Sequence, residues 1–283
     1  MTFSAVYDLV HGPVSYDFVT WLVRAKKEAG DRRLHVVIAP KEDGLGGFSR
    51  NWGKHDEHAA RWRLWHICVA AAPLAEATVT VAPSRKWAEG ADWWPEGKAH
   101  FMGPLVDAAR KGEAIPKLRA TEAARRYVRR WAENLKRPYV TLTLRDQDTD
   151  PARNSDLTAW DQLALTLDGR FAYIRLEDTQ QALQRSYGNF PETDIDLRLA
   201  LYEQAAMNLI GNNGPQELLK FSDAPYLIFN LGIESWREHF RKYFHMEFGD
   251  QLPWANKNQR LIYKPDSFAV MLEAFENWAL ATS

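Results

Sequence analysis

Residues 201–230 have the sequence LYEQAAMNLIGNNGPQELLKFSDAPYLIFN, which indicates buried strands alternating with a helix. The apolar run 206–210 predicts a first buried strand. Segment 215–221 begins with a proline and has an early glutamate, which is typical of a helix start. A second apolar run, 224–229, predicts another buried strand. Strand, helix and strand in this order are the elementary unit of an α/β protein.

The turn between this first strand and the helix consists of Asn212, Asn213, Gly214 and Pro215. In α/β proteins such a turn can hold a phosphate, because the first N–H groups of the helix are free and the dipole favours an anion. Gly214 would let the backbone approach the ligand closely. The same residue types are also common in ordinary tight turns. The sequence leaves both interpretations open.

The alternation extends through the whole chain. Apolar runs predict strands at 3–10, 34–39, 78–82, 139–144, 171–176, 207–210, 226–229 and 259–263. Periodic segments and capping residues predict helices at 16–29, 57–72, 121–135 with Thr121 as its N-cap, 157–167, 195–205, 215–221 and 267–279. A shorter helix is expected at 105–111, and segment 236–243 completes the second half.

Buried strands that alternate with helices predict parallel sheets with both faces covered. The irregular stretch 83–116, with several Gly and Pro residues, separates two such sets of strands. We therefore expect an α/β fold of two Rossmann-like domains with a cleft between them, an N-terminal domain at 1–115 and a C-terminal domain at 116–283.

Composition excludes several classes of function. The chain has 283 residues, of which 46% are hydrophobic, and its 36 basic and 37 acidic residues nearly cancel. No global basic field draws the chain to nucleic acid, so we expect no nucleic-acid partner. The single cysteine, Cys68, excludes an internal disulfide and a thiolate-rich metal site. The sequence shows no apolar run of about 18 residues, and we expect a soluble, cytoplasmic protein without a transmembrane segment.

Two arginines follow the predicted strand 139–144. Arg145 comes directly after the strand, and Arg153 lies in the next loop, just before Asn154 and Ser155. A guanidinium group binds phosphate oxygens in pairs and keeps its charge, so both arginines are suited to clamp a diphosphate at the carboxyl edge of the sheet. Asn154 and Ser155 could contribute to this site, and one of them could instead cap the helix that follows.

The strand, turn and helix at 201–230 resemble the C-terminal half of GT-B glycosyltransferases and of nucleotide-sugar 2-epimerases. A strand followed by arginine is similar to GT-B fucosyltransferases, although their adjacent Arg-Arg pair is absent here, since seven residues separate Arg145 from Arg153. The resemblance implies that these arginines and the turn containing Asn213, Gly214 and Pro215 face the diphosphate of a nucleotide-sugar donor.

The resemblance further implies a metal-independent glycosyltransferase without a cofactor, which moves a sugar from that donor to a carbohydrate or glycan acceptor. A nucleotide-sugar 2-epimerase-like enzyme is the alternative with the same architecture. A noncatalytic protein that binds a sugar or a nucleotide is the alternative from another class. An acceptor requirement separates a transferase from an epimerase.

In GT-B enzymes the acceptor docks on loops of the first domain, and an acidic residue or a histidine there can accept the hydroxyl proton. Asp17 and His11 follow the first predicted strand and are the candidate bases. Glu177 follows another strand and could accept ribose hydroxyls, or it could cap the next segment. Gln251 and Trp254 could bracket a sugar or a base, or could belong to a structural loop.

No metal site is expected. Asp148 and Asp150 form a D-x-D string, which holds a divalent metal in GT-A glycosyltransferases. We prefer the interpretation that both are solvated acidic residues of a loop. The sequence also contains no HExxH, GxSxG or Walker A pattern, so a metalloprotease, a serine hydrolase and a P-loop enzyme have no support.

Overall fold

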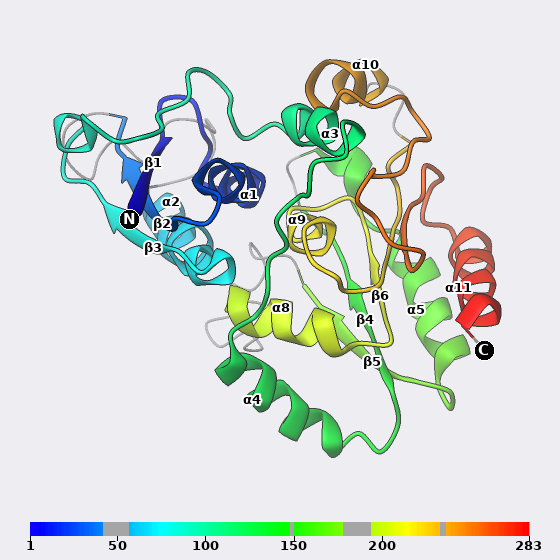
Figure 1. Ribbon diagram of the computed structural model, residues 1–283. Helices are drawn as coiled ribbons and strands as arrows, with labels where there is room; N and C mark the ends of the chain where they lie inside the picture. Colours follow the sequence, from blue (N-terminus) through cyan, green and yellow to red (C-terminus); the bar gives the residue numbers. More distant parts are fainter. Residues whose placement is uncertain (42–56, 148–149, 178–193, 233–235, 283) are drawn as a thin grey trace.

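The computed structural model describes residues 1–41, 57–147, 150–177, 194–232 and 236–282 (Figure 1). All structural statements below concern these residues. They form two parallel sheets, one from each half of the chain, with helices packed around both. The predicted α/β fold with two Rossmann-like halves is confirmed.

The first sheet has three strands in the order β1-β2-β3. Their bounds are Thr2–Asp8 for β1, Arg33–Ala39 for β2 and Thr78–Val81 for β3. Helix α1, Asp17–Ala29, connects β1 to β2 and buries Phe18 and Trp21 against Tyr7 of β1. This packing fixes the end of β1 and the start of α1, from which several first-half residues reach the cleft.

The second sheet has five parallel strands in the order β5-β4-β6-β7-β8. Their bounds are Tyr139–Thr143 for β4, Ala172–Leu176 for β5, Met207–Ile210 for β6, Tyr226–Ile228 for β7 and Gln259–Leu261 for β8. Strand β4 is buried at all five positions and β6 at all four. Complete burial explains why these strands are mostly apolar. Two of their polar side chains are paired inside the sheet, where Thr141 Oγ1 donates to Asn208 Oδ1 at 2.6 Å.

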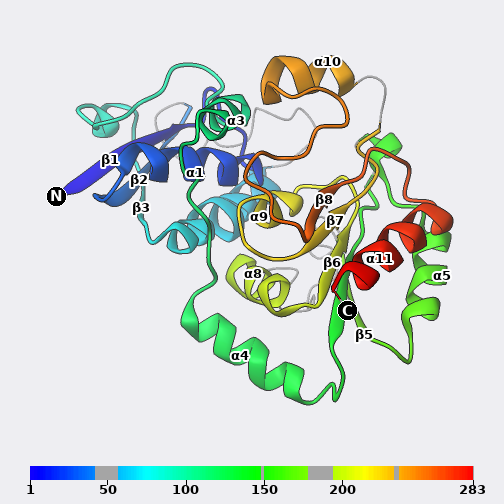
Figure 2. The same ribbon diagram turned by 45° about the vertical axis from the view of Figure 1, so that its right-hand side comes forward.

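Helices cover both faces of the second sheet, as Figures 1 and 2 show. One face carries α5, Leu157–Leu167, and α11, Phe268–Thr282. The other carries α8, Ile195–Gln204, and α9, Gln216–Lys220, with α4, Glu122–Glu133, packed against α8. The remaining helical segments are α2 at Glu57–Arg63, a π-helical turn at Leu64–Val69, short 3-10 turns at Ala72–Ala75, Lys86–Ala88 and Pro151–Arg153, α3 at Gly103–Arg110, α10 at Arg237–His239, and a second π-helical turn at Phe240–Phe244.

Side-chain caps define the starts of α4, α5 and α8, the last capped by Asp194. Thr121 Oγ1 accepts a hydrogen bond from the Ala124 N–H, which confirms the predicted N-cap of α4. Helix α5 is capped by Asp156, whose Oδ1 accepts from the Ala159 N–H at 3.2 Å. The expectation that Asn154 or Ser155 caps this helix is wrong, because Asp156 occupies the N-cap position and both residues come before it.

The two halves share a continuous core where α1 meets α9. Thr20 of α1 donates a hydrogen bond to Glu217 Oε2 at 2.9 Å, and Lys220 Nζ lies 2.7 Å from Glu217 Oε1. The side chains of Glu217 and Lys220 are only 11% and 5% exposed. A buried carboxylate that is paired in this way fixes the position of α9 relative to α1.

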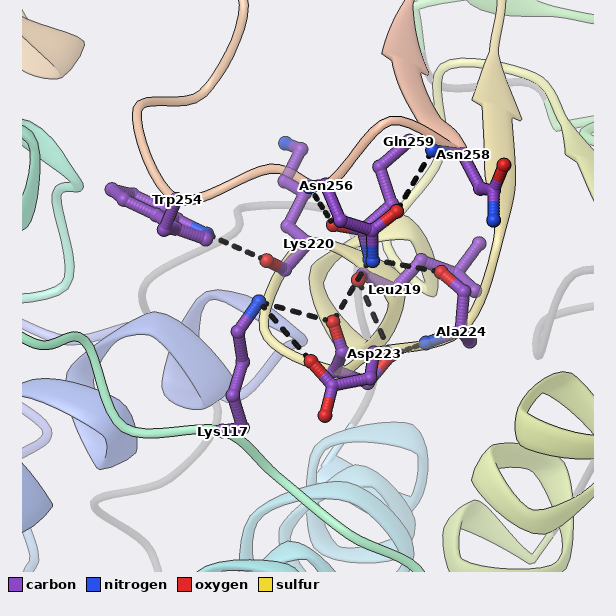
Figure 3. A network of polar contacts seen from close by, with 10 residues as sticks. Lys117, Leu219, Lys220, Asp223, Ala224, Trp254, Asn256, Asn258 and Gln259 are labelled. Carbon is purple, nitrogen blue, oxygen red and sulfur yellow. Dashed lines mark hydrogen bonds and ion pairs between the residues drawn. The ribbon is translucent and has the colours of Figure 1, made fainter. Parts of the chain in front are cut away.

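The segment that joins the halves packs on both of them. The Arg119 N–H donates to the Leu74 carbonyl at 3.0 Å, and the Leu118 N–H donates to the Phe221 carbonyl at 2.6 Å. Lys117 extends to the turn after α9, where its Nζ donates to the Ser222 carbonyl and lies 3.8 Å from Asp223 (Figure 3). The domain boundary at residues 115 and 116 stays a prediction.

The turn after α9 is further held by the loop before β8. Gln259 donates from Nε2 to the carbonyls of Ser222 and Ala224, both at 2.9 Å (Figure 3). Trp254 donates from its indole N–H to the Lys220 carbonyl at 2.8 Å and stacks on Phe221. These contacts fix the C-terminal end of α9 and thereby support the turn that precedes the helix.

Candidate functional site

A cavity of about 490 Å³ lies between the two halves of the molecule. The first half lines it with residues after β1, from α1 and from the segment before α3. The second half lines it with the loops that follow β4 and β6 and with the segment around α10. The polar side chains among the described lining residues are Ser15, Asp17, Thr20, Arg63, Lys98, His100, Arg145, Gln147, Asp150, Arg153, Asn213, Gln216, Glu217 and His239.

The cavity opens at the point where the strand order of the second sheet reverses, between β4 and β6. Strands β4 and β6 are neighbours, but the chain continues from β4 to β5 on one side and from β6 to β7 on the other. The segment after β4 leads to α5 and the segment after β6 leads to α9, on opposite faces of the sheet. Their divergence leaves a crevice at the carboxyl ends of the strands, where ligands bind in open α/β sheets.

Both predicted arginines line this crevice. Arg145 follows β4 and is buried, and its Nη2 lies 3.5 Å from the Asp150 carbonyl. Arg153 donates from Nε to the Asn212 carbonyl at 3.1 Å and from Nη2 to Asn212 Oδ1 at 3.3 Å. The Trp236 ring lies 5.0 Å from the Arg153 guanidinium carbon. Arg153 Nη1 also lies 3.9 Å from Asp150 Oδ2, and these contacts together orient the guanidinium group at the cavity wall.

The turn after β6 brings an amide into the same crevice. Asn213 is fully buried and lines the cavity, and neither its Oδ1 nor its Nδ2 has a hydrogen-bond partner in the part of the chain described here. Gln216 Oε1 is likewise without a partner there. Buried amides are normally paired, so unpaired ones beside a cavity indicate a missing ligand group or water.

Gly214 and Pro215 line the cavity as well. A Cβ atom on Gly214 would lie 2.7 Å from Tyr16 Cδ2, so only glycine lets this turn pack against the start of α1. Helix α9 has five residues, and its dipole is correspondingly small. Of the two phosphate-binding features that the sequence suggested, the arginines Arg145 and Arg153 therefore supply most of the positive potential on this side and the helix start supplies little.

Asp17 faces the arginines from the first half. Its Oδ2 accepts a hydrogen bond from Ser15 Oγ at 2.9 Å. Burial raises the pKa of the Asp17 carboxyl above its ordinary value of 3.8, while the Ser15 hydrogen bond and the charge of Arg153 act in the opposite direction. A carboxylate with a raised pKa is a stronger proton acceptor than an exposed one.

The segment before α3 contributes groups that the sequence did not single out. Lys98 is exposed at the cavity and His100 is partly buried beside it. Burial, and then the charges of Lys98 and Arg24, lower the pKa of His100 to about 4, so its imidazole is neutral at pH 7. Arg63, at the end of α2, is a further cation on this wall. No periodic pattern or motif in the sequence marks these three residues.

A cluster of aromatic side chains forms another part of the cavity wall. Trp236 and His239 have ring centroids 5.1 Å apart, and Phe101 and Tyr243 have centroids 4.1 Å apart. Trp236, His239, Phe101 and Phe244 line the cavity. Burial lowers the pKa of His239, although the nearby Asp17 charge raises it. Flat apolar faces beside charged groups suit a ligand with both ring and anionic parts.

Four predicted site residues have structural contacts instead. Asn154 exchanges two hydrogen bonds with the Gln147 backbone, and Ser155 does so with the Arg145 backbone. Gln251 donates to the Leu261 carbonyl and accepts from the Leu261 N–H, which covers the outer edge of β8. Trp254 is held against the end of α9 as described above. None of these four is among the described residues that line the cavity.

The other predicted positions lie outside the cavity lining or outside the described residues. His11 is exposed in the turn after β1, where its N–H donates to the Asp8 carbonyl. Glu177 follows β5 and is partly buried, and its carbonyl accepts from Arg198. Asp148 lies outside the described residues, whereas Asp150 has a left-handed backbone and lines the cavity.

The described residues contain neither a metal-ligating cluster nor a membrane-spanning helix. No group of three or more His, Cys, Asp and Glu side chains there could hold a metal ion. Among the same residues, no helix is both long enough and apolar enough to cross a bilayer.

Comparison with known proteins extends the description of the fold. No protein-family model and no curated protein matches the chain. The solved structure of E. coli ADP-heptose LPS heptosyltransferase II matches with a TM-score of 0.50 and 12% identity, covering 100% of this chain and 99% of that one. A glycosyl transferase family 9 structure from Veillonella parvula has a TM-score of 0.49 and 9% identity, covering 99% and 97%. The first match shows that the chain has the fold of a GT-B glycosyltransferase.

Proposed function

We propose that the protein is a glycosyltransferase that moves a sugar from a nucleotide-sugar donor to a carbohydrate or glycan acceptor. One observation carries the proposal: Arg145, Arg153 and the amide of Asn213, which has no partner among the described residues, meet at the switch point of the second sheet, opposite a carboxyl group of the first half. Transfer of a sugar from a diphosphate to a hydroxyl group requires cations and amides beside the leaving group and a base beside the hydroxyl group. The two walls of the cavity supply these groups.

The fold supports the proposed glycosyltransferase function by analogy. The heptosyltransferase that matches this chain is named for ADP-heptose, a nucleotide-sugar. At 12% identity the likeness concerns the fold, and fold alone does not determine function. ADP-sugars are nevertheless the first donors to test, and the chemistry of the cleft provides the independent argument.

In the proposed reaction, an acceptor hydroxyl oxygen attacks the anomeric carbon of the donor sugar. The hydroxyl proton passes to the Asp17 carboxylate, and the bond between the anomeric carbon and the diphosphate oxygen breaks. The bonding electrons leave with the nucleoside diphosphate. Arg145 and Arg153 offset the charge that develops on this leaving group, which is the main electrostatic demand of the step.

Asp17 is preferred to His11 as the base. Asp17 lines the cavity and has a raised pKa, whereas His11 is exposed on the turn after β1. A general base has to reach the proton that it removes, so position is the first criterion and pKa the second. His239, whose pKa is lowered by burial, is another titratable group that lines the cavity, on the aromatic wall.

The proposal includes independence from a divalent metal, and the observation in favour is the set of cationic side chains. Arg145, Arg153, Lys98 and Arg63 all line the cavity and can neutralise a diphosphate without an added cation. Addition of EDTA to the assay tests this point separately, since a metal-dependent transferase would lose turnover.

The test of the function is a transfer assay with nucleotide-sugars that carry different bases and sugars, against a mixture of glycan acceptors. We expect release of a nucleoside diphosphate that depends on both the donor and an acceptor. Release without any acceptor, together with a change in the sugar, would indicate the 2-epimerase-like alternative. Binding of a donor without its consumption under any condition would indicate a noncatalytic binding protein.

A further inference from the structure

Helix α4 presents a basic outer face. It packs on α8 through Ala124 and Val128, which are buried, and in Figures 1 and 2 it lies at the lower edge of the molecule. Arg126, Arg129 and Arg130 are exposed. None of the described residues that line the cleft belongs to α4. The proposed transfer reaction therefore does not account for this face.

The charge on this face is local and unbalanced. Residues 119–137 contain seven Lys and Arg and two Glu, although the whole chain has a net charge of −1. Arg125 pairs with Glu122 and Arg137 pairs with Asp168. No ion pair within the described ranges involves the other five cations, which are Arg119, Arg126, Arg129, Arg130 and Lys136. A purely solvated surface helix normally alternates its charges, so the excess indicates an anionic partner.

Two aromatic side chains lie on the same helix. Tyr127 is 56% exposed, and Trp131, one turn further on, is 36% exposed and packs its ring edge-on against Tyr139. Both side chains combine an apolar ring with one polar group. Tyr and Trp are enriched where protein meets the headgroup region of a bilayer, because the ring and the polar group then each meet a suitable medium.

We propose that the outer face of α4 binds the surface of an anionic lipid bilayer. The helix would lie along the bilayer surface with Arg126, Arg129 and Arg130 near the headgroups and Tyr127 at the boundary of the acyl chains. A nucleic acid fits less well, because the chain as a whole has no positive field to attract a polyanion over a distance. The proposal does not rest on the proposed function, since it concerns another surface.

Charge arithmetic gives the expected size of the effect. Each Lys or Arg near an anionic bilayer raises the affinity about fivefold, so removal of three should weaken binding roughly 100-fold. The attraction acts within a Debye length of about 10 Å at 0.1 M salt, so it should fall steeply as salt is added.

Vesicle flotation tests the proposal. Purified protein is mixed with vesicles of phosphatidylcholine alone or with about 30% phosphatidylglycerol, and the bound fraction is measured at several salt concentrations. We expect binding to the anionic vesicles only, and a roughly 100-fold loss in the variant R126A/R129A/R130A. Tyr127→Ser should weaken binding by a smaller factor. Because these side chains are exposed, the variants should fold as the wild type does, and thermal unfolding of each variant checks this.

The matched control is K257A/R260A/K264A, which removes three exposed cations around β8, at the other end of the second sheet. It should retain vesicle binding. Equal loss in both triple variants would overturn the proposal, since net charge rather than α4 would then determine binding. Absence of wild-type binding to anionic vesicles would overturn it too, as would α4-dependent binding to duplex DNA or RNA without binding to vesicles.

Discussion

Ser155 closes the loop after β4 onto Arg145. The Ser155 N–H donates to the Arg145 carbonyl at 2.8 Å, and Ser155 Oγ accepts from the Arg145 N–H at 3.0 Å. This pair of bonds returns the chain to the end of the strand and brings Arg153 to the same cavity as Arg145, although seven residues separate the two arginines in sequence. A Cβ on Gly211 would lie 3.0 Å from Ser155 Oγ, so the neighbouring turn also depends on this closure.

Replacement of Arg153 by alanine should lower kcat/KM by about 10²- to 10³-fold, because a preorganised cationic donor to the leaving group is lost. Arg153→Lys should recover only part of the activity, since lysine keeps the charge but cannot form the paired bonds to Asn212. Steady-state kinetics with the active donor provide the measurement.

The matched control for Arg153 is Arg170→Ala. Arg170 is an exposed cation that pairs with Glu276 on the α5 and α11 side of the molecule, away from the cavity. Its loss should leave kcat/KM within about twofold of wild type, as expected for an exposed ion pair. Equal losses in both variants would remove Arg153 from the mechanism.

Asp17→Asn should lower kcat by about 10²- to 10⁴-fold, which is the usual range for loss of a general base. Because burial raises the pKa of Asp17, wild-type kcat/KM should fall on the acid side at a pH above 3.8, as the carboxylate becomes protonated. The residual activity of the Asn variant should lack this acid limb. A pH–rate profile of both proteins decides the matter.

Ser15→Ala tests more sharply whether the Asp17 carboxyl group causes the acid limb of the pH–rate profile. The Ser15 hydrogen bond stabilises ionised Asp17, so its removal should raise the pKa further and move the acid limb to higher pH. An unchanged limb in the Ser15 variant would show that another group titrates. Exposed Asp31, replaced by Asn, is the control and should leave the profile as it is.

The buried pair between Glu217 and Lys220 should matter strongly for stability. Lys220→Met leaves the Glu217 carboxylate buried with Thr20 as its remaining hydrogen-bond donor, and should cost about 3–5 kcal/mol of unfolding free energy. The double variant E217Q/K220M should be more stable than Lys220→Met alone, because no unpaired charge remains. Urea unfolding of the two variants tests this, and equal stabilities would contradict it.

His100 should make the stability depend on pH. Its pKa is about 4 in the folded protein and near 6.5 when unfolded, so the unfolded chain binds the proton first as the pH falls. This contribution to stability is complete above pH 6.5 and is lost between pH 6.5 and 4. Between pH 7.5 and 5, wild type should lose about 2 kcal/mol more than His100→Gln. Unfolding free energies at both pH values test it, and parallel losses would exclude His100 as the cause.

Most of the fold could be predicted from the sequence because its signals are local. The strands of a buried parallel sheet appear as short apolar runs, so the predicted bounds of helix α5 agree with the structure and those of strand β6 agree to within one residue. The π-helical turn at Leu64–Val69 was not foreseen, since its apolar spacing resembles that of the α-helix before it.

The residues of the candidate site likewise fall into those that local sequence signals mark and those that only tertiary packing places. Arg145, Arg153, Asp17 and the turn at Gly214 follow strands at the carboxyl edges of the sheets, so topology brings them to the cleft. Lys98 and His100 come from an irregular connection whose path depends on tertiary packing. Gln251 and Trp254 were predicted to bracket a ligand, but their polar groups satisfy the backbone of Leu261 and Lys220 instead. Which polar side chains the fold uses for itself depends on long-range contacts that one sequence does not reveal.

Binding of the donor nucleotide tests the central claim most directly, because it needs neither acceptor nor turnover. Thermal and urea unfolding would be measured in EDTA with UDP, GDP, ADP, CMP and dTDP, for wild type, Arg153→Ala and Arg170→Ala. We predict that one nucleotide, at about 100 times its dissociation constant, stabilises wild type and Arg170→Ala by roughly 2.7 kcal/mol and Arg153→Ala by much less. Absence of any stabilisation by these nucleotides, or equal stabilisation of all three proteins, would contradict the proposed donor site.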